Sequence, residues 1–179
     1  MHNKVSIHGR FQPFHNAHLA YAMAALAVAE KVYIGLTRVL TEPGIGGEIA
    51  PHRLELQSNP LSYYQRTQII TRALLDAGVS PSRFDVGPFP IEKPDRLKEF
   101  WPLHLPCCTT VVDAWNTKKI SVLREIGYEV VVMRDIIKPG LQVATGTKIR
   151  ELIRSGDESW VQYVPPSVPA SLKLLDAVF

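Results

Sequence analysis

Two histidines and an arginine near the start of the chain have the types and spacing to bind phosphate groups. Residues 9–18 read GRFQPFHNAH; they follow a short alternating run, Lys4 to His8, and precede an alanine-rich run, Leu19 to Ala29. These two patterns are typical of a strand and a helix, so the segment between them is predicted to be a strand-to-helix turn. Backbone N–H groups at a helix N-terminus bind anions. The segment is therefore a candidate polyphosphate site.

The side chains of this turn fit that chemistry. Gly9 lets the backbone approach a ligand, and Arg10 supplies a permanent cation with a forked set of donors. Pro13 fixes the turn, and His15 and His18, three residues apart, share one face of the first helical turn, where the helix dipole adds positive potential. A metal site on the two histidines is not expected, because no third ligand lies nearby in the sequence.

The composition indicates a globular domain of ordinary type. The chain has 179 residues, of which 46% are hydrophobic and 21% charged, and its net charge of +3 gives no reason to expect a nucleic-acid or membrane partner. The cysteines, Cys107 and Cys108, are adjacent and cannot close an ordinary disulfide loop, which favours a reducing compartment. With neither a signal-peptide pattern nor a long apolar run, the protein is predicted to be soluble and cytoplasmic.

Strand patterns alternate with helix patterns along the chain. The expected strands are Lys4–His8, Lys31–Thr37, Phe84–Phe89, Thr109–Ala114 and Glu129–Arg134. The expected helices are Leu19–Ala29, Tyr63–Ala77, Asp95–Leu105 with a break at Pro102, Lys118–Ile126, Lys148–Ser155 and Pro169–Val178. Ser62 is the expected N-cap of the second helix, and Gly78 ends it. Residues 39–58 carry few regular signals and are interpreted as a lid or an insertion.

This alternation predicts an α/β fold with a Rossmann-like, doubly wound, parallel five-stranded sheet. All 179 residues are expected to form one domain, with a C-terminal helical part at residues 147–179. In such sheets ligands bind at the carboxyl ends of the strands. The turn at residues 9–18 is predicted to lie at that edge.

Two motifs resemble those of nucleotidylyltransferases with an H-x-G-H signature, and most closely the archaeal-type nicotinamide mononucleotide adenylyltransferases. Residues 9–18 match, at six positions in order, a first motif that reads approximately G-R-x-Q-P-x-H-x-G-H. Residues 145–150, TGTKIR, match a second motif at the start of a late helix. Weaker similarities are Asn59 to Ser62, and Trp101 with His104, which resemble a Trp-x-x-His pair at the family's pyridine pocket.

The resemblance implies adenylyl transfer from ATP to nicotinamide or nicotinate mononucleotide, giving NAD or its acid form and pyrophosphate. It implies Mg²⁺ bound with ATP, no metal ligands from the protein, a small phosphorylated acceptor and a homo-oligomer. The implied catalytic residues are His15, His18, Arg10 and Arg150. The implied ATP-binding residues are Gly9, Arg10, Phe11, Gln12, His18, Thr145, Gly146, Thr147 and Arg150, and the implied acceptor-binding residues are Trp101, His104, Asp113 and Trp115.

Departures from the family pattern leave the second substrate open. Ala17 replaces the glycine between the histidines, and residues 114–117, AWNT, replace a Ser-Gly-Asn-Pro segment. Transfer to pantetheine phosphate, a flavin mononucleotide or, from CTP, an alcohol phosphate remains an alternative. So does a non-catalytic domain that senses ATP or a dinucleotide. Arg66, which follows the Asn59 segment, is interpreted as a charge on the helix surface.

Overall fold

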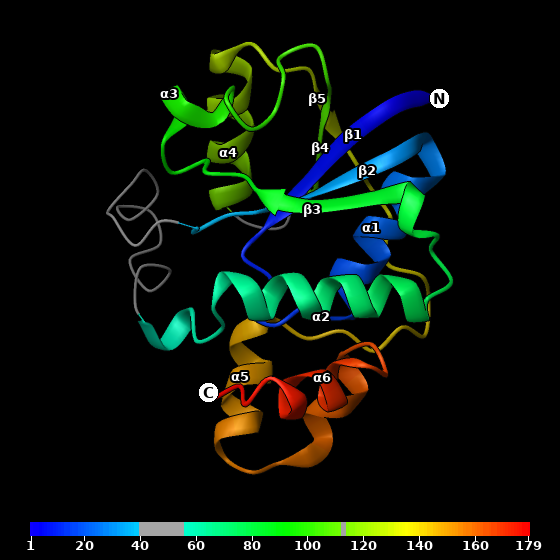
Figure 1. Ribbon diagram of the computed structural model, residues 1–179, viewed down its shortest axis with the longest axis vertical. Coiled ribbons are helices and arrows are strands. Elements are labelled where there is room, and N and C mark those ends of the chain that lie inside the picture. Colours follow the sequence, from blue (N-terminus) through cyan, green and yellow to red (C-terminus); the bar gives the residue numbers. More distant parts are fainter. Residues whose placement is uncertain (40–55, 112–113) are drawn as a thin grey trace.

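Five parallel strands form a single sheet in the order β3-β2-β1-β4-β5 (Figure 1). The structure, a computed structural model, describes residues 1–39, 56–111 and 114–179. The strands are β1 (His2–Gly9), β2 (Ala29–Leu36), β3 (Phe84–Pro88), β4 (Cys107–Thr109) and β5 (Val130–Val132). This order confirms the predicted Rossmann-like parallel sheet. Strands β1, β2 and β3 follow one another toward one edge of the sheet, and β4 and β5 follow toward the other. The strand order therefore reverses between β1 and β4.

Helices cover both faces of the sheet (Figure 1). One face carries α1 (Asn16–Val28) and α2 (Tyr63–Asp76), and the other carries α3 (Pro94–Leu97) and α4 (Ala114–Ile126). The C-terminal helices α5 (Gly146–Arg154) and α6 (Val168–Leu174) lie beyond α2, against which α6 packs. Short 3₁₀ helices in the described part of the chain are η2 (Leu56–Ser58), η3 (Pro81–Arg83) and η4 (Glu158–Tyr163).

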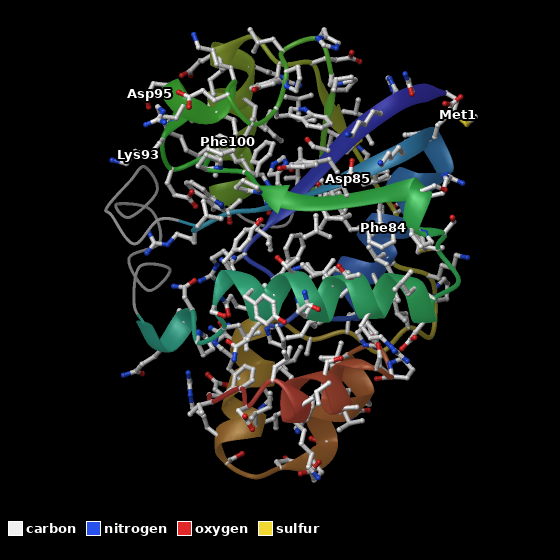
Figure 2. All side chains as sticks on the ribbon, in the orientation of Figure 1. Met1, Phe84, Asp85, Lys93, Asp95 and Phe100 are labelled. Carbon is white, nitrogen blue, oxygen red and sulfur yellow. The ribbon has the colours of Figure 1, made fainter. Side chains whose placement is uncertain are left out.

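Apolar side chains fill both sides of the sheet. The core under α1 and α2 contains Ile7, Ile34 and Ile70, and the core under α3 and α4 contains Phe89 and Leu123. A strand directs successive side chains to opposite faces, and Figure 2 shows Phe84 and Asp85 on opposite sides of β3. The Asp85 carboxylate accepts from Lys4 and Lys31 at 2.8 Å each. The two cores fix the sheet whose edge carries the candidate site.

Local capping signals place the helix ends as the sequence predicts. The Ser62 hydroxyl accepts from the Gln65 N–H at 3.2 Å, and the Gln65 side chain accepts from the Ser62 N–H at 2.9 Å. This reciprocal pair is a capping box at the start of α2. Gly78 follows the end of α2 with φ +81°, and Gly127 follows α4 with φ +109°. Both glycines adopt the left-handed conformation that side chains disfavour.

Several predicted boundaries differ from those of the structure. The fourth strand was expected at 109–114, but β4 ends at Thr109, its last residue paired with β5. The next helix, α4, begins at Ala114, four residues before the expected start. The helix expected at 95–105, with a break at Pro102, is shorter than predicted: α3 ends at Leu97, before the proline. The first helix begins at Asn16, three residues before its expected start.

Some expectations fall on residues that the structure does not describe. Most of the expected lid or insertion at 39–58, and Asp113, lie outside the described ranges. Within those ranges, none of the helices combines the length and the apolar character needed to cross a membrane.

Candidate active site

A cavity of about 1320 Å³ opens at the carboxyl ends of β1, β4 and β5. It lies where the strand order reverses between β1 and β4, the place where α/β sheets bind ligands. A pocket for one small ligand occupies roughly 300–1,000 Å³, so this cavity has room for a nucleotide and a second substrate. The predicted site residues that line it are Gly9, Arg10, Phe11, Gln12, His15, His18, Trp115, Thr145, Gly146, Thr147 and Arg150. The fold thus unites the two distant motifs.

His15 and His18 form a stacked pair in the wall of this cavity. Their ring centroids are 3.5 Å apart with an interplanar angle of 20°. Burial lowers the pKa of His15 to about 4, and burial together with the nearby His15 and Arg10 lowers the pKa of His18 well below its usual value. Both rings are therefore neutral at pH 7. The His18 Nδ1 accepts from the His15 backbone N–H at 3.3 Å, which leaves the His18 proton on Nε2 as a donor.

Buried hydrogen bonds fix the turn that carries these histidines. The Gln12 amide donates to the Leu61 carbonyl and accepts from the Leu61 N–H, each at 2.9 Å. The Arg150 guanidinium donates from Nη1 to the Gln12 carbonyl at 2.8 Å and from Nη2 to the Thr147 hydroxyl at 3.2 Å. Its buried Nε has no hydrogen-bond partner among the described residues. Arg150 therefore joins the second motif to the first, and it also lines the cavity.

The first turn of α5 packs closely against the first motif. Thr145 is the N-cap, and its hydroxyl accepts from the Lys148 N–H at 3.2 Å. A Cβ added at Gly146 would lie 3.0 Å from the Gln12 carbonyl oxygen, so the absence of a side chain permits this approach. Because the N-terminal N–H groups of a helix favour negative charge, the start of α5 adds donors suited to an anion to the same cavity lining as the histidine pair.

Arg66 is not the surface charge expected from the sequence. Its side chain is buried, and it donates to the carbonyls of Arg10 at 2.9 Å, Thr37 at 2.7 Å and Arg38 at 3.1 Å. Burial lowers its pKa to about 10, a value at which it keeps its charge at pH 7. One guanidinium on α2 thereby satisfies three carbonyls that follow β1 and β2. Sequence could not place it, because an arginine on a helix is usually solvated.

The expected acceptor residues are not all brought to the cavity. Trp115 is half-buried and lines it from α4. Trp101 is 2% exposed, stacks on Tyr33 at 5.1 Å and donates from Nε1 to the Leu105 carbonyl at 3.0 Å. His104 is exposed, and neither it nor Trp101 lines the described cavity. The acceptor roles of these residues stay predictions.

Two buried polar residues of the cavity wall were missed by the sequence reasoning. His8 is 3% exposed at the end of β1 and stacks on Phe89, with ring centroids 4.3 Å apart. Burial, with the charge of Lys119 as the second cause, lowers the pKa of His8 well below its usual value. Lys119 lines the cavity from α4 and is 6% exposed. Its spacing of four residues from Trp115 was the available signal, because i and i+4 share one helix face.

Cationic side chains outnumber carboxylates around this cavity. Among the described residues, the lining contains four cations and one carboxylate, namely Arg10, Lys119, Arg134 and Arg150 against Asp135. The three lining histidines, whose pKa values are all lowered, add donors without adding charge at pH 7. Such a lining favours anionic ligands.

The comparison with known families decides what kind of protein this is. The model of the cytidylyltransferase-like family matches residues 7–156. The chain belongs to the cytidylyltransferase-like family. Both motifs fall inside the matched range, and membership confirms the nucleotidyltransferase class that the sequence predicts.

Curated relatives cover nearly the whole chain. A phosphonoformate cytidylyltransferase from Streptomyces viridochromogenes is 33% identical over 168 residues, which cover 93% of this chain and 89% of the relative. A nicotinamide-nucleotide adenylyltransferase from Thermococcus kodakarensis is 28% identical over 170 residues, covering 95% and 82%. The archaeal relatives support the predicted synthesis of a pyridine dinucleotide. The Streptomyces relative is named for a different reaction, cytidylyl transfer to phosphonoformate.

Solved structures show the same fold. A bifunctional NMN adenylyltransferase/ADP ribose pyrophosphatase from Francisella tularensis aligns with a TM-score of 0.70 and 21% identity over 99% of this chain. The present chain of 179 residues spans about half, 51%, of that longer protein. A second structure of the Francisella protein, at 22% identity, holds AMP and a manganese ion.

Proposed function

We propose that this family member joins ATP to nicotinamide or nicotinate mononucleotide and releases pyrophosphate. One observation carries the proposal: residues 9–18 and residues 145–150 meet in a single cation-lined cavity that is large enough for two nucleotides. The archaeal relatives support the choice of a pyridine mononucleotide as the acceptor.

The reaction requires positioning and charge stabilisation rather than a protein nucleophile. A phosphate oxygen of the mononucleotide attacks the α-phosphorus of ATP in line. The bond from the α-phosphorus to the bridging oxygen breaks, and pyrophosphate leaves with the electron pair. Because the acceptor is already an anion, the chain supplies donors at the places where charge develops. Arg10 and the His18 Nε2–H serve the α-phosphate and the bridging oxygen, while Thr147 and the first turn of α5 receive the β- and γ-phosphates.

A divalent metal ion is part of the proposal as a companion of the nucleotide. Within the described residues there is no group of three histidine, cysteine, aspartate or glutamate side chains able to hold a metal ion. The described cavity lining therefore does not fit a resident metal site. Mg²⁺ keeps several waters and binds phosphate oxygens readily, so we assign it to the substrate Mg-ATP and give it no protein ligands.

Cytidylyl transfer to a phosphonate is the second candidate, favoured by the Streptomyces relative at 33% identity. Ala17, which lines the cavity in place of the motif glycine, is a residue on the nucleotide side where such a change of base would be accommodated. The two candidates share the phosphate chemistry and differ in the base and the acceptor.

Pyrophosphate release tests the proposal directly. The protein is incubated with Mg-ATP or Mg-CTP and, separately, nicotinamide mononucleotide, nicotinate mononucleotide, phosphonoformate, pantetheine phosphate, riboflavin phosphate or no acceptor. We expect release with ATP and a pyridine mononucleotide. Release only with CTP and phosphonoformate replaces the first candidate by the second. Nucleotide binding without release in any well refutes both and supports the sensor interpretation.

Two further parts of the proposal concern the protein in the cell. We propose that it works in the cytoplasm and as a homo-oligomer, as the sequence resemblance implies. Light scattering coupled to size exclusion measures the mass of the assembly, and a mass of one chain, 20.0 kDa, at micromolar concentration contradicts the second part.

A further inference from the structure

A buried polar pair lines the cavity outside residues 9–18 and 145–150. Lys119 comes from α4 and His8 from the end of β1, and both line the cavity at 6% and 3% exposure. Figure 1 shows α4 on the face of the sheet opposite α1, the helix that carries the histidine pair. The cavity therefore has buried polar lining residues in addition to those of the two motifs.

His8 has a feature that a purely structural residue avoids. Both of its ring nitrogens are buried and without a hydrogen-bond partner among the described residues. Buried polar atoms are nearly always paired. The ring stacks flat on Phe89, with an interplanar angle of 1°, so its orientation is fixed by packing. A neutral imidazole in this position offers one N–H donor to a ligand in the cavity.

Lys119 adds a charge beside that donor. Its ammonium group is close enough to His8 to lower the pKa of the imidazole. Trp115, one turn before Lys119 on the same face of α4, also lines the cavity and is half-buried. An aromatic surface and a buried cation therefore lie next to each other on one helix face.

We propose that Lys119 and His8 bind a carboxylate of the acceptor beside Trp115, so that the acceptor carries an acidic group in addition to its reacting phosphate. This inference rests on the proposed function and deepens it: of the two pyridine mononucleotides, it selects nicotinate mononucleotide. The flat pyridine ring lies against Trp115, and its carboxylate receives the Lys119 ammonium and the His8 N–H. Nicotinamide mononucleotide has the same shape without the charge.

The two mononucleotides form a matched pair of substrates. In wild type we expect kcat/KM for the acid to exceed that for the amide by at least about tenfold, the usual worth of a hydrogen-bonded charge pair. Lys119→Gln should bring this ratio close to one, chiefly through KM for the acid, and Lys119→Arg should restore part of it. The matched control is Lys118→Gln, which removes the neighbouring exposed lysine of α4 and should leave the ratio unchanged. A wild-type ratio near one, or a ratio that Lys119→Gln does not change, overturns the inference.

A second variant separates binding from folding. His8→Phe keeps the ring stacked on Phe89 and removes the two unpartnered nitrogens. We expect it to unfold at a higher urea concentration than wild type while the acid-to-amide ratio falls. An unchanged ratio in this variant removes His8 from the site.

Binding without turnover distinguishes failure of the inference from failure of the proposed function. At equal concentrations, nicotinate mononucleotide should raise the melting temperature more than the amide does, and Lys119→Gln should abolish the difference. If pyrophosphate is released only with phosphonoformate, the pyridine acceptor is refuted. The carboxylate site then stands if Lys119→Gln raises KM for phosphonoformate, and falls if it does not. If no well releases pyrophosphate, the melting-temperature difference alone decides the inference.

Discussion

His15 should make the stability of the protein depend on pH in a way that one substitution removes. Its ring is 8% exposed, and burial lowers its pKa from 6.5 to about 4. Because the folded state disfavours the charged ring, the unfolded chain binds a proton first as the pH falls. The contribution of His15 is fully present above pH 6.5 and is lost between pH 6.5 and pH 4.

The size of this effect follows from the two pKa values. The fall of the His15 pKa from 6.5 to about 4 amounts to about 3.4 kcal/mol when the pH is well below 4, at about 1.36 kcal/mol for a tenfold change in proton affinity. At about pH 5 the ring in the unfolded chain is almost fully charged and the folded ring is mostly neutral, which gives a loss of about 2 kcal/mol relative to about pH 7.5. This is a large part of a typical folding free energy of about 5–15 kcal/mol.

Urea unfolding of wild type and His15→Asn measures this contribution. Asparagine is a good N-cap residue for α1 and does not titrate. His8, whose pKa is also lowered, destabilises both proteins in acid. Because His15 contributes to the lowered pKa of His18, the difference between the two proteins measures His15 together with that contribution. We expect the loss between about pH 7.5 and pH 5 to be smaller by about 2 kcal/mol in His15→Asn. His104→Asn, which removes an exposed histidine, is the control and should behave as wild type. Equal losses in wild type and His15→Asn, within about 0.5 kcal/mol, would refute the assignment of His15 as a buried neutral ring.

Three other predictions concern the turn and its supports. His18→Ala should lower turnover by a factor of about 100 or more with little change in the circular dichroism spectrum, as for a donor to developing charge; unchanged turnover removes His18 from the mechanism. Gly146→Ala places a Cβ 3.0 Å from the Gln12 carbonyl oxygen and should raise KM for the nucleotide several-fold, and an unaltered KM means that the start of α5 does not bind it. Arg66→Leu leaves one buried and two part-buried carbonyls without this donor and should lower the unfolding free energy by about 3 kcal/mol or more. Arg66→Lys should recover part of the loss, and a loss below about 1 kcal/mol contradicts the buried role.

The parts of the fold predicted correctly are those with local physical causes. The Ser62 cap and the Gly78 and Gly127 helix ends depend on a few neighbouring residues, and apolar alternation is enough to indicate parallel strands between helices. The end of β4 at Thr109 depends on pairing with β5, which the local sequence does not contain.

In the candidate site, sequence predicted the residues with a motif and missed those defined by burial. The motif residues from Gly9 to His18 and from Thr145 to Arg150 meet as expected, although Arg150 and Gln12 also hold the turn through buried hydrogen bonds. His8 resembles an ordinary polar position of a strand, and Lys119 resembles a solvated helix lysine. Only the packing of α4 against the sheet shows that both line the cavity.

The contact between Arg150 and the Gln12 carbonyl has a consequence for the order in which the protein matures. The two residues are 138 positions apart in the chain, so during synthesis the first motif leaves the ribosome long before its partner exists. Domains fold as their chains emerge, and contacts between distant positions form late because their loops are costly to close. In a nascent chain without α5, the turn that carries both histidines therefore lacks the hydrogen bond from Arg150 to the Gln12 carbonyl. Nucleotide chemistry then begins only after α5 has been made.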